Sequence, residues 1–164
     1  MSWVLHRVDD RLIHGQVVVT WSHHLHPARV WVVDDACAHN EWESDLLRAC
    51  APDLEVRVVD VAEAARIYAE EASAPGRALL LVRTLQSALA LVEAGAPIPR
   101  FNVGGLHYAA GKDKVNDYVY LDADDRRAAR ALLERGIALE VQDVPAARPE
   151  PLTALDPGVT PDRS

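Results

Sequence analysis

A histidine and an arginine stand three residues apart in a polar stretch near the N-terminus, DDRLIHGQ over residues 9–16. A neutral imidazole such as that of His14 is a nucleophile that can take up a phosphoryl group. The guanidinium of Arg11 can bind phosphoryl oxygens through two parallel hydrogen bonds. Spacing alone leaves a second interpretation open, in which His14 caps the loop and Arg11 pairs with Asp9 or Asp10.

The elements that must position this loop are short β-branched runs that alternate with longer amphipathic stretches. Strands are predicted at Trp3–Val8, Arg29–Asp34, Glu55–Val59, Ala78–Val82, Phe101–Val103, Tyr118–Leu121 and Ile137–Val141. Helices are predicted at Gln16–Leu25, Glu41–Cys50, Val61–Glu71, Leu85–Ala94 and Asp124–Arg135. The alternation predicts an α/β fold with an open, mostly parallel central sheet of about seven strands and helices on both faces.

In such a sheet, ligands bind beyond the carboxyl ends of the strands. Polar and basic residues collect in the loops expected there, and the first loop leads into a helix whose free N–H groups favour an anion. The candidates for a phosphate pocket beside Arg11 and His14 are Asp10, Gly15, Gln16, Arg83, Thr84, Gly105 and His107. Asp10 is expected either to orient a ring nitrogen of His14 or to bind Arg11. His107 is expected either to line the pocket or to be a loop residue without a role.

Composition excludes several classes of function. The chain has 164 residues with 25 Asp and Glu against 17 Lys and Arg, a formal net charge of −8, which argues against binding of nucleic acid through its phosphate backbone. Apolar runs such as Ala78–Val82 fall far short of the ~20 residues of a membrane span. The charged N-terminus does not resemble a signal peptide, so a cytoplasmic location is expected.

Length and composition predict one domain over residues 1–146. The following residues, 147–164, are rich in proline and poor in apolar side chains, which predicts a mobile C-terminal tail.

The remaining candidate ligands and aromatic residues are expected to be structural, and no metal site is predicted. The two cysteines lack the spacing of a zinc site and are expected to be buried. Asp34 and Asp35 could bind Mg²⁺ at a strand end, but the Lys and the third acid of a receiver-type site are missing. The other residues in this class are His23, His24 and His26, expected at an exposed helix end, and Trp21, Trp31 and Trp42, expected in the core.

Three segments resemble one family of proteins. DDRLIHGQVVVTW (residues 9–21), VWVVDDACAHNEW (30–42) and FNVGGLHYAAGK (101–112) are similar to motifs of the IIB components of the mannose/fructose/sorbose family of bacterial sugar phosphotransferase systems. The resemblance extends in order and spacing from about Trp3 to Pro145, and the family's fold agrees with the one predicted above. One departure is Arg83-Thr84, where the family more often has Lys-Thr.

The resemblance implies a phosphocarrier subunit. His14 matches the family's phosphorylated histidine, with Nδ1 as the acceptor atom, and Arg11 matches the essential arginine beside it. The implied partners are a IIA phosphohistidine protein as donor, the membrane-embedded IIC and IID subunits of the sugar permease, and the sugar as final acceptor. No cofactor is implied, and the location is cytoplasmic and peripheral to the permease. An alternative is a phosphorylation-dependent regulatory relay of the same fold without a transport role.

Overall fold

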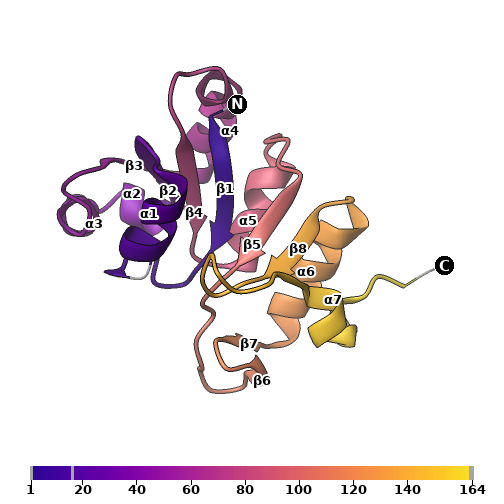
Figure 1. Ribbon diagram of the computed structural model, residues 1–164. Coiled ribbons are helices and arrows are strands. Elements are labelled where there is room, and N and C mark those ends of the chain that lie inside the picture. Colours follow the sequence, from indigo (N-terminus) through magenta and orange to yellow (C-terminus); the bar gives the residue numbers. More distant parts are fainter. Residues whose placement is uncertain (1, 16, 163–164) are drawn as a thin grey trace.

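The structure is a computed structural model that describes residues 2–15 and 17–162. Strands and helices alternate along the chain (Figure 1). The elements are β1 (Trp3–Val8), η1 (Val17–Trp21), α1 (Ser22–Leu25), β2 (Arg29–Val33), α2 (Asp35–Ala38), α3 (Glu41–Ala49), β3 (Glu55–Val59), α4 (Val61–Ala72), β4 (Ala78–Val82), α5 (Leu85–Glu93), β5 (Arg100–Val103), β6 (Asp113–Asn116), β7 (Val119–Leu121), α6 (Ala123–Glu134), β8 (Ala138–Val141), β9 (Glu150–Pro151), α7 (Leu152–Leu155) and η2 (Pro157–Val159).

The central sheet has seven strands in the order β3-β2-β4-β1-β5-β8-β9. All of its strands are parallel except β9, which pairs antiparallel with β8. Every side chain of β4 is buried, as expected for a central strand that helices cover on both faces. The predicted α/β fold with a mostly parallel sheet of about seven strands is confirmed.

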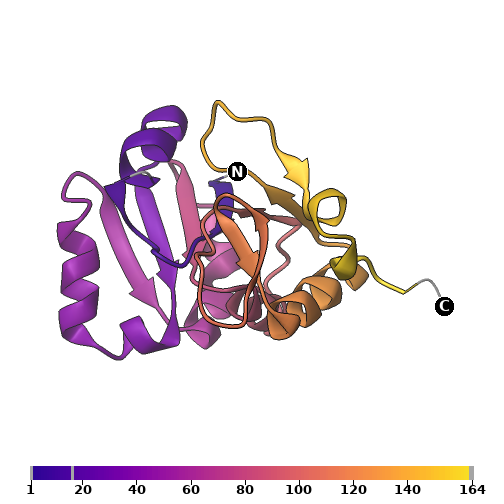
Figure 2. The ribbon, with the colours of Figure 1, turned by 90° about the horizontal axis from the view of Figure 1, so that it is seen from below.

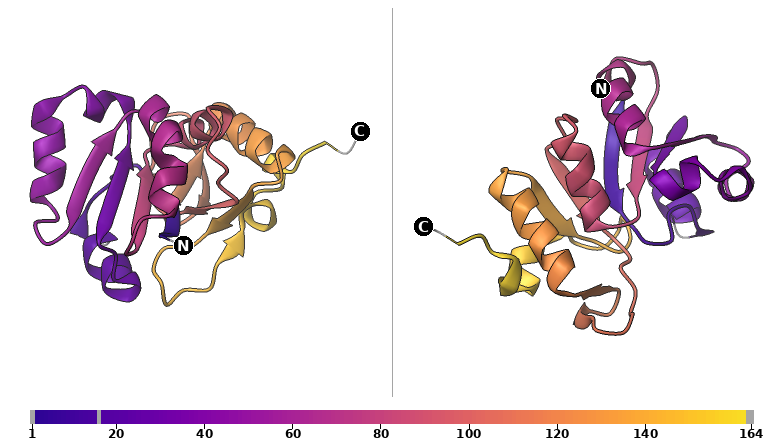
Figure 3. Two further views of the ribbon diagram at one scale, coloured as in Figure 1. Left: turned by 90° about the horizontal axis from the view of Figure 1, so that it is seen from above. Right: turned by 180° about the vertical axis from the view of Figure 1, so that it is seen from behind.

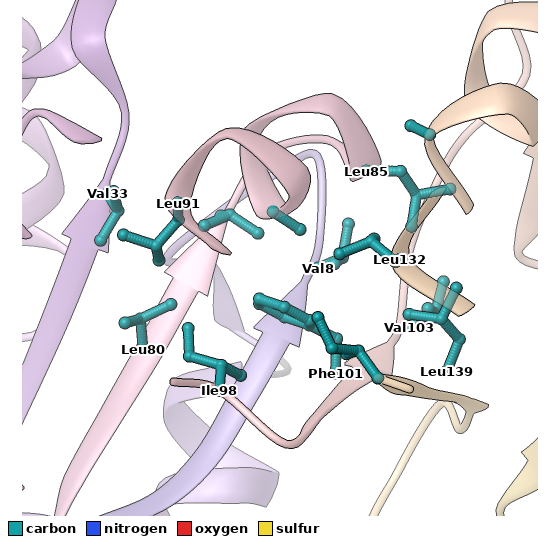
Figure 4. Close-up of a cluster of buried hydrophobic side chains, with 14 of the residues drawn as sticks. Val8, Val33, Leu80, Leu85, Leu91, Ile98, Phe101, Val103, Leu132 and Leu139 are labelled. Carbon is teal, nitrogen blue, oxygen red and sulfur yellow. The ribbon is translucent and has the colours of Figure 1, made fainter. Parts of the chain in front are cut away.

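Two apolar clusters fill the space on the two sides of the sheet. The larger lies under α4, α5 and α6, which run across one face of the sheet when it is seen from behind (Figure 3). Phe101, Leu80 and Val8 of the sheet point there toward Leu91 of α5 and Leu132 of α6 (Figure 4). The smaller cluster, on the other face, includes Leu12 and Val17 and receives Leu25 and Leu47 at its margin. The first loop is therefore anchored in a core.

Two predicted elements and two predicted side-chain positions differ in the structure. Tyr118–Leu121 is not in the central sheet: β7 forms a separate antiparallel hairpin with β6, a strand that the sequence did not predict because Asp113–Asn116 is polar. The helix expected over Gln16–Leu25 contains a π-helical turn, η1, before the short α1. Trp42 is 70% exposed on α3, so the expectation that it lies in the core is wrong. Cys37 is buried as expected, but Cys50 is exposed.

The C-terminal segment packs against the domain over residues 150–159, in contrast to the mobile tail expected from composition. β9 adds to the edge of β8, and α7 and η2 follow it (Figure 1). Leu152 and Val159 are completely buried, and Arg126 of α6 forms an ion pair with Asp156 at 2.8 Å. Strand pairing, two buried apolar side chains and an ion pair thus dock this segment, although its overall composition is typical of a tail.

None of the helices within residues 2–15 and 17–162 is both long enough and apolar enough to cross a membrane.

Candidate functional site

The loop after β1 lies at the carboxyl edge of the sheet, between the loops that follow β4 and β5. The backbone N–H of Asp9 donates to the carbonyl of Val82 at 2.9 Å, and that of Asp10 donates to the carbonyl of Gly105 at 2.8 Å. Figure 2 looks onto this edge, with the indigo loop after β1 and the orange hairpin β6–β7 both facing the viewer. The topology therefore brings three of the loops predicted to form the site together.

His14 is held by a buried carboxylate. Its Nε2 atom lies 3.1 Å from Oδ2 of Asp9, whose side chain is completely buried, while 14% of the His14 side chain is exposed. A carboxylate can only accept a hydrogen bond, so Nε2 is the nitrogen that carries the proton. The second carboxylate oxygen of Asp9 accepts the backbone N–H of Arg11 at 3.1 Å and lies 3.7 Å from Nε of that residue. Nδ1 of His14 is the ring nitrogen that Asp9 leaves uncommitted.

Asp9 remains ionised despite its burial. Burial by itself raises the pKa of the Asp9 carboxyl, but the hydrogen bond and charge of His14, the amide of Arg11 and the charge of Arg7 outweigh it. Together they hold the pKa of Asp9 below its usual value, which keeps the carboxylate available as an acceptor for His14.

Arg7 holds Asp9 in place from the interior of the fold. Its side chain is completely buried, and its guanidinium lies 3.5 Å from the Asp9 carboxylate and donates to the carbonyls of Gln142 at 2.9 Å and Asp143 at 3.0 Å. It also bonds the Asn102 side chain and lies 5.1 Å from the centre of the Trp21 ring. Burial lowers the pKa of Arg7, while the charges of Asp9 and Asp143 oppose that shift. The segment that follows β8 thus supports the first loop through Arg7.

The sequence prediction did not assign a role to Arg7, and it considered Asp9 only as a partner of Arg11. A signal was present, however. Side chains of a strand alternate between the two faces of the sheet, so an arginine at position 7 of the strand and an acid at position 9, directly after it, are expected on the same face.

Glycines after β5 make room for these side chains. A Cβ atom on Gly104 would lie 2.6 Å from Nε of Arg7 and still closer to its guanidinium carbon. A Cβ atom on Gly105 would lie 2.8 Å from Cε1 of His107, 3.2 Å from Oδ1 of Asp9 and 3.4 Å from Nη2 of Arg11. The candidate Gly105 is therefore at the centre of the cluster, and three polar side chains converge above it.

Asp10 binds His107. Its two carboxylate oxygens lie 2.6 Å from Nδ1 and 2.7 Å from the backbone nitrogen of His107. The carboxylate that is hydrogen-bonded to His14 is that of Asp9, one residue earlier. These two contacts tie the loop after β1 to the loop after β5.

The two candidates after β4 have different surroundings. Arg83 donates to the backbone carbonyl of Asp10 at 3.2 Å and forms an ion pair with Asp34 at 3.4 Å. Burial lowers the pKa of Arg83, but the charge of Asp34 and the bonds to Asp34 and Cys37 outweigh it, so the pKa is raised. Arg83 thus adds a fixed positive charge near the first loop. The hydroxyl of Thr84 caps α5 by accepting the backbone N–H of Ser87 at 3.0 Å.

The backbone of the first loop is strained at one residue. Leu12 has a φ of +56°, a value rare for a bulky side chain, and its side chain is only 1% exposed. Its burial holds the turn that brings His14 back over Asp9. Gly15 follows in helical conformation with an open surrounding. The candidate Gln16 lies outside the described residues.

Metal-type side chains do not gather in the part of the chain that the structure describes: it contains no group of three or more His, Cys, Asp or Glu residues arranged to hold an ion. What the site offers instead is an oriented imidazole with arginine side chains around it, an arrangement suited to an anionic group.

Comparison with known proteins identifies the family. The sequence model described as PTS system sorbose subfamily IIB component matches residues 3–159. A PTS system mannose-specific EIIAB component of Escherichia coli (strain K12) is 40% identical over 141 residues, which are 85% of this chain and 44% of that protein. The chain therefore spans less than half of the length of that relative. A PTS system fructose-specific EIIB component of Bacillus subtilis (strain 168) is 31% identical over 162 residues, 98% of this chain and 99% of that protein.

A solved structure agrees with these sequences. The IIBSor domain of the sorbose permease from Klebsiella pneumoniae has a TM-score of 0.85 and 30% sequence identity, and the match covers 94% of this chain and 96% of that one. The resemblance seen in the three motifs is thereby confirmed. The chain belongs to the sorbose-subfamily IIB components of sugar phosphotransferase systems, whose members are sugar phosphotransferase subunits.

Proposed function

We propose that the protein carries a phosphoryl group on Nδ1 of His14, in transit from a IIA phosphohistidine to a sugar. The observation that carries this proposal is the bond of 3.1 Å between Nε2 of His14 and Asp9. It keeps the proton on Nε2, which leaves a lone pair on Nδ1 for attack on phosphorus. In the transfer, the P–N bond of the donor histidine breaks as the bond from phosphorus to Nδ1 forms.

Arg11 supplies the charge for this step. Its side chain is 46% exposed, so it can meet a group brought by another protein, while its backbone is fixed through Asp9. The three phosphoryl oxygens carry the developing negative charge, which a guanidinium neutralises with two hydrogen bonds. Arg83 and the backbone at Gly15 and Gly105 are further parts of the proposed phosphate pocket.

The proposed partners are those of the family's relay. They are a IIA protein as donor and the membrane subunits IIC and IID, which hold the sugar as final acceptor. The protein would then act at the cytoplasmic surface of the permease as a protein-Nπ-phosphohistidine–sugar phosphotransferase subunit. The phosphoryl group arrives already attached to a protein, so no cofactor is needed.

Intact mass spectrometry tests the acceptor. The protein is incubated with phosphoenolpyruvate, the general phosphotransferase proteins and a IIA protein, and should gain the mass of one phosphoryl group in an acid-labile linkage. His14→Ala should abolish this gain, because no other imidazole is oriented in the same way by Asp9. His24→Ala, a change of the same type on the short helix α1, should leave it intact. Acid-labile phosphorylation that persists in His14→Ala would contradict the proposal.

A substitution of lysine for Arg11 distinguishes the geometry of the hydrogen-bond donors from their charge. Arg11→Lys keeps the positive charge but loses the planar pair of donors, so the transfer rate should fall by at least about tenfold. The rate is read from the time course of the phosphorylated mass. A normal rate in this variant would mean that Arg11 serves only the fold of the loop.

A further inference from the structure

The site contains a second imidazole that the proposed transfer does not use. His107 is 46% exposed, and both its ring nitrogen Nδ1 and its backbone nitrogen are bound to the carboxylate of Asp10, at 2.6 and 2.7 Å. Two contacts from one carboxylate fix the direction of the ring. Because Nδ1 donates to Asp10, the nitrogen turned away from Asp10 is Nε2.

The residue that holds His107 is itself fixed through its backbone. The backbone N–H of Asp10 donates to the carbonyl of Gly105 at 2.8 Å, and its carbonyl accepts a hydrogen bond from Arg83 at 3.2 Å. With its backbone held from two neighbouring loops, Asp10 and the ring bonded to it need less ordering when a ligand arrives, which lowers the cost of binding.

The ring of His107 faces the same small space as Arg11 and Asp9. The point at which Gly105 lacks a Cβ atom is 2.8 Å from Cε1 of His107 and 3.4 Å from Nη2 of Arg11. In an imidazole, Cε1 is bonded to both nitrogens, so Nε2 is one bond away from the ring atom that borders this space. Asp9, the residue that orients His14, is 3.2 Å from the same point.

We infer that His107 is a second phosphoryl-binding residue, which donates a hydrogen bond from Nε2 to an oxygen of the phosphoryl group at His14. The inference rests on the proposed function. It requires the imidazolium form, because Nδ1 uses its own proton for Asp10. No bond to His107 forms or breaks: the phosphoryl group moves from the donor histidine to Nδ1 of His14, and His107 only shares its charge and proton with one oxygen. Arg11 and His107 would thus hold the group from two sides.

His107→Asn tests the donor alone. The amide nitrogen of asparagine takes the place of Nδ1 and can still donate to Asp10, but the side chain has nothing in the place of Nε2. Phosphoryl uptake from the IIA protein should be about tenfold slower, the loss expected for one charge-assisted hydrogen bond. The ³¹P resonance of the phosphohistidine should also move. The matched control is His39→Asn, in the exposed pair that His39 forms with Asp60 at 3.5 Å; it should leave the rate and the resonance unchanged.

A measurement on the unaltered protein avoids dependence on a variant. Inorganic phosphate, titrated into the protein, should shift the ¹⁵Nε2 resonance of His107 and leave that of His39 in place. If both resonances respond equally, and His107→Asn takes up the phosphoryl group at the normal rate with an unchanged ³¹P resonance, the inference is overturned. That result differs from failure of the proposed function, which would show as no acid-labile phosphorylation of the unaltered protein at His14.

Discussion

Asp9 connects the proton on His14, the proposed nucleophile, to the buried charge of Arg7. One carboxylate accepts from His14 at 3.1 Å and faces Arg7 at 3.5 Å, and both acid and arginine side chains are completely buried. Breaking a buried ion pair by removing one charge is costly, because the other charge stays behind without compensation. In the proposed transfer, the same residue therefore serves both the stability of the fold and the reactivity of His14.

Asp9→Asn should lower the stability of the fold and also abolish the proposed reactivity of His14. The neutral amide leaves Arg7 without its counter-charge, which should lower the free energy of unfolding by about 3–5 kcal/mol. It can also donate to Nε2, so His14 would carry its proton on Nδ1 and uptake of phosphate should be lost. Urea denaturation and the mass assay measure the two effects. Asp45→Asn on the exposed face of α3 is the control, and equal stability of both variants would contradict the role of Asp9.

His6 makes the stability of the fold depend on pH. Burial lowers its pKa from 6.5 to about 4, and its Nε2 atom lies 2.8 Å from the hydroxyl of Tyr68. Below pH 6.5 the unfolded chain binds a proton at this position and the folded protein does not. The free energy of unfolding should therefore fall as the pH drops from 6.5 toward about 4, by roughly 3 kcal/mol in total. The lowered pKa of Asp9 acts only at more acidic pH.

Unfolding titrations between pH 7 and 4 test the contribution of His6. His6→Gln keeps an amide that can bond the hydroxyl of Tyr68 but does not titrate, so the slope in this window should largely disappear. An unchanged slope in that variant would assign the pH dependence to other groups.

Single elements differ in how far the sequence predicts them. The five consecutive apolar residues of β4 predict a strand that is buried on both faces, and all five are buried. Helix α3 carries apolar side chains on two sides, and pattern alone cannot tell which side faces inward. Ser44 and Leu47 face the domain, while Trp42 and Leu46 are 70% and 52% exposed. The positions of His14 and Arg11 follow from the loop in which they lie. Arg7, in contrast, is held by carbonyls that follow β8 far along the chain, and Asp9 by its contact with Arg7.

The turn after β5 should not tolerate a side chain at residue 104. In Gly104→Ala the new methyl group would overlap the guanidinium of Arg7, which has no free space because it is completely buried. The free energy of unfolding of this variant should be lower by at least about 3 kcal/mol, which is the upper end of the range for overpacked cores. Gly15→Ala, with no atom near its Cβ position, is the matched control in urea denaturation. Equal midpoints for the two variants would show that Arg7 can move aside.

At the scale of the whole molecule, the C-terminal segment is part of the fold. Its four prolines and charged residues predicted a tail, and composition averaged over residues 147–164 hides the two apolar residues that decide its position. Leu152 and Val159 are completely buried, and β9 extends the sheet beyond β8. Such docking depends on which single side chains become buried, and tertiary contacts rather than composition determine that.

Leu152→Ala should measure the strength of this docking. Removing a fully buried leucine side chain costs about 2–5 kcal/mol, so the thermal midpoint should drop by several degrees. Leu46→Ala removes the same atoms from an exposed position and should change little. Thermal unfolding followed by circular dichroism compares the two. A midpoint close to that of the unaltered protein for Leu152→Ala would mean that the segment contributes little to stability.

The contacts that hold Arg7 in place also have a consequence for synthesis on the ribosome. The carbonyls that hold its guanidinium belong to Gln142 and Asp143, more than 130 residues later in the chain. The loop that carries His14 therefore leaves the ribosome well before the residues that support it. We expect chains that end between these two segments to be chemically silent: a nascent polypeptide acquires its proposed phosphoryl acceptor only after Gln142 and Asp143 have emerged, so such fragments do not take phosphoryl groups from the donor.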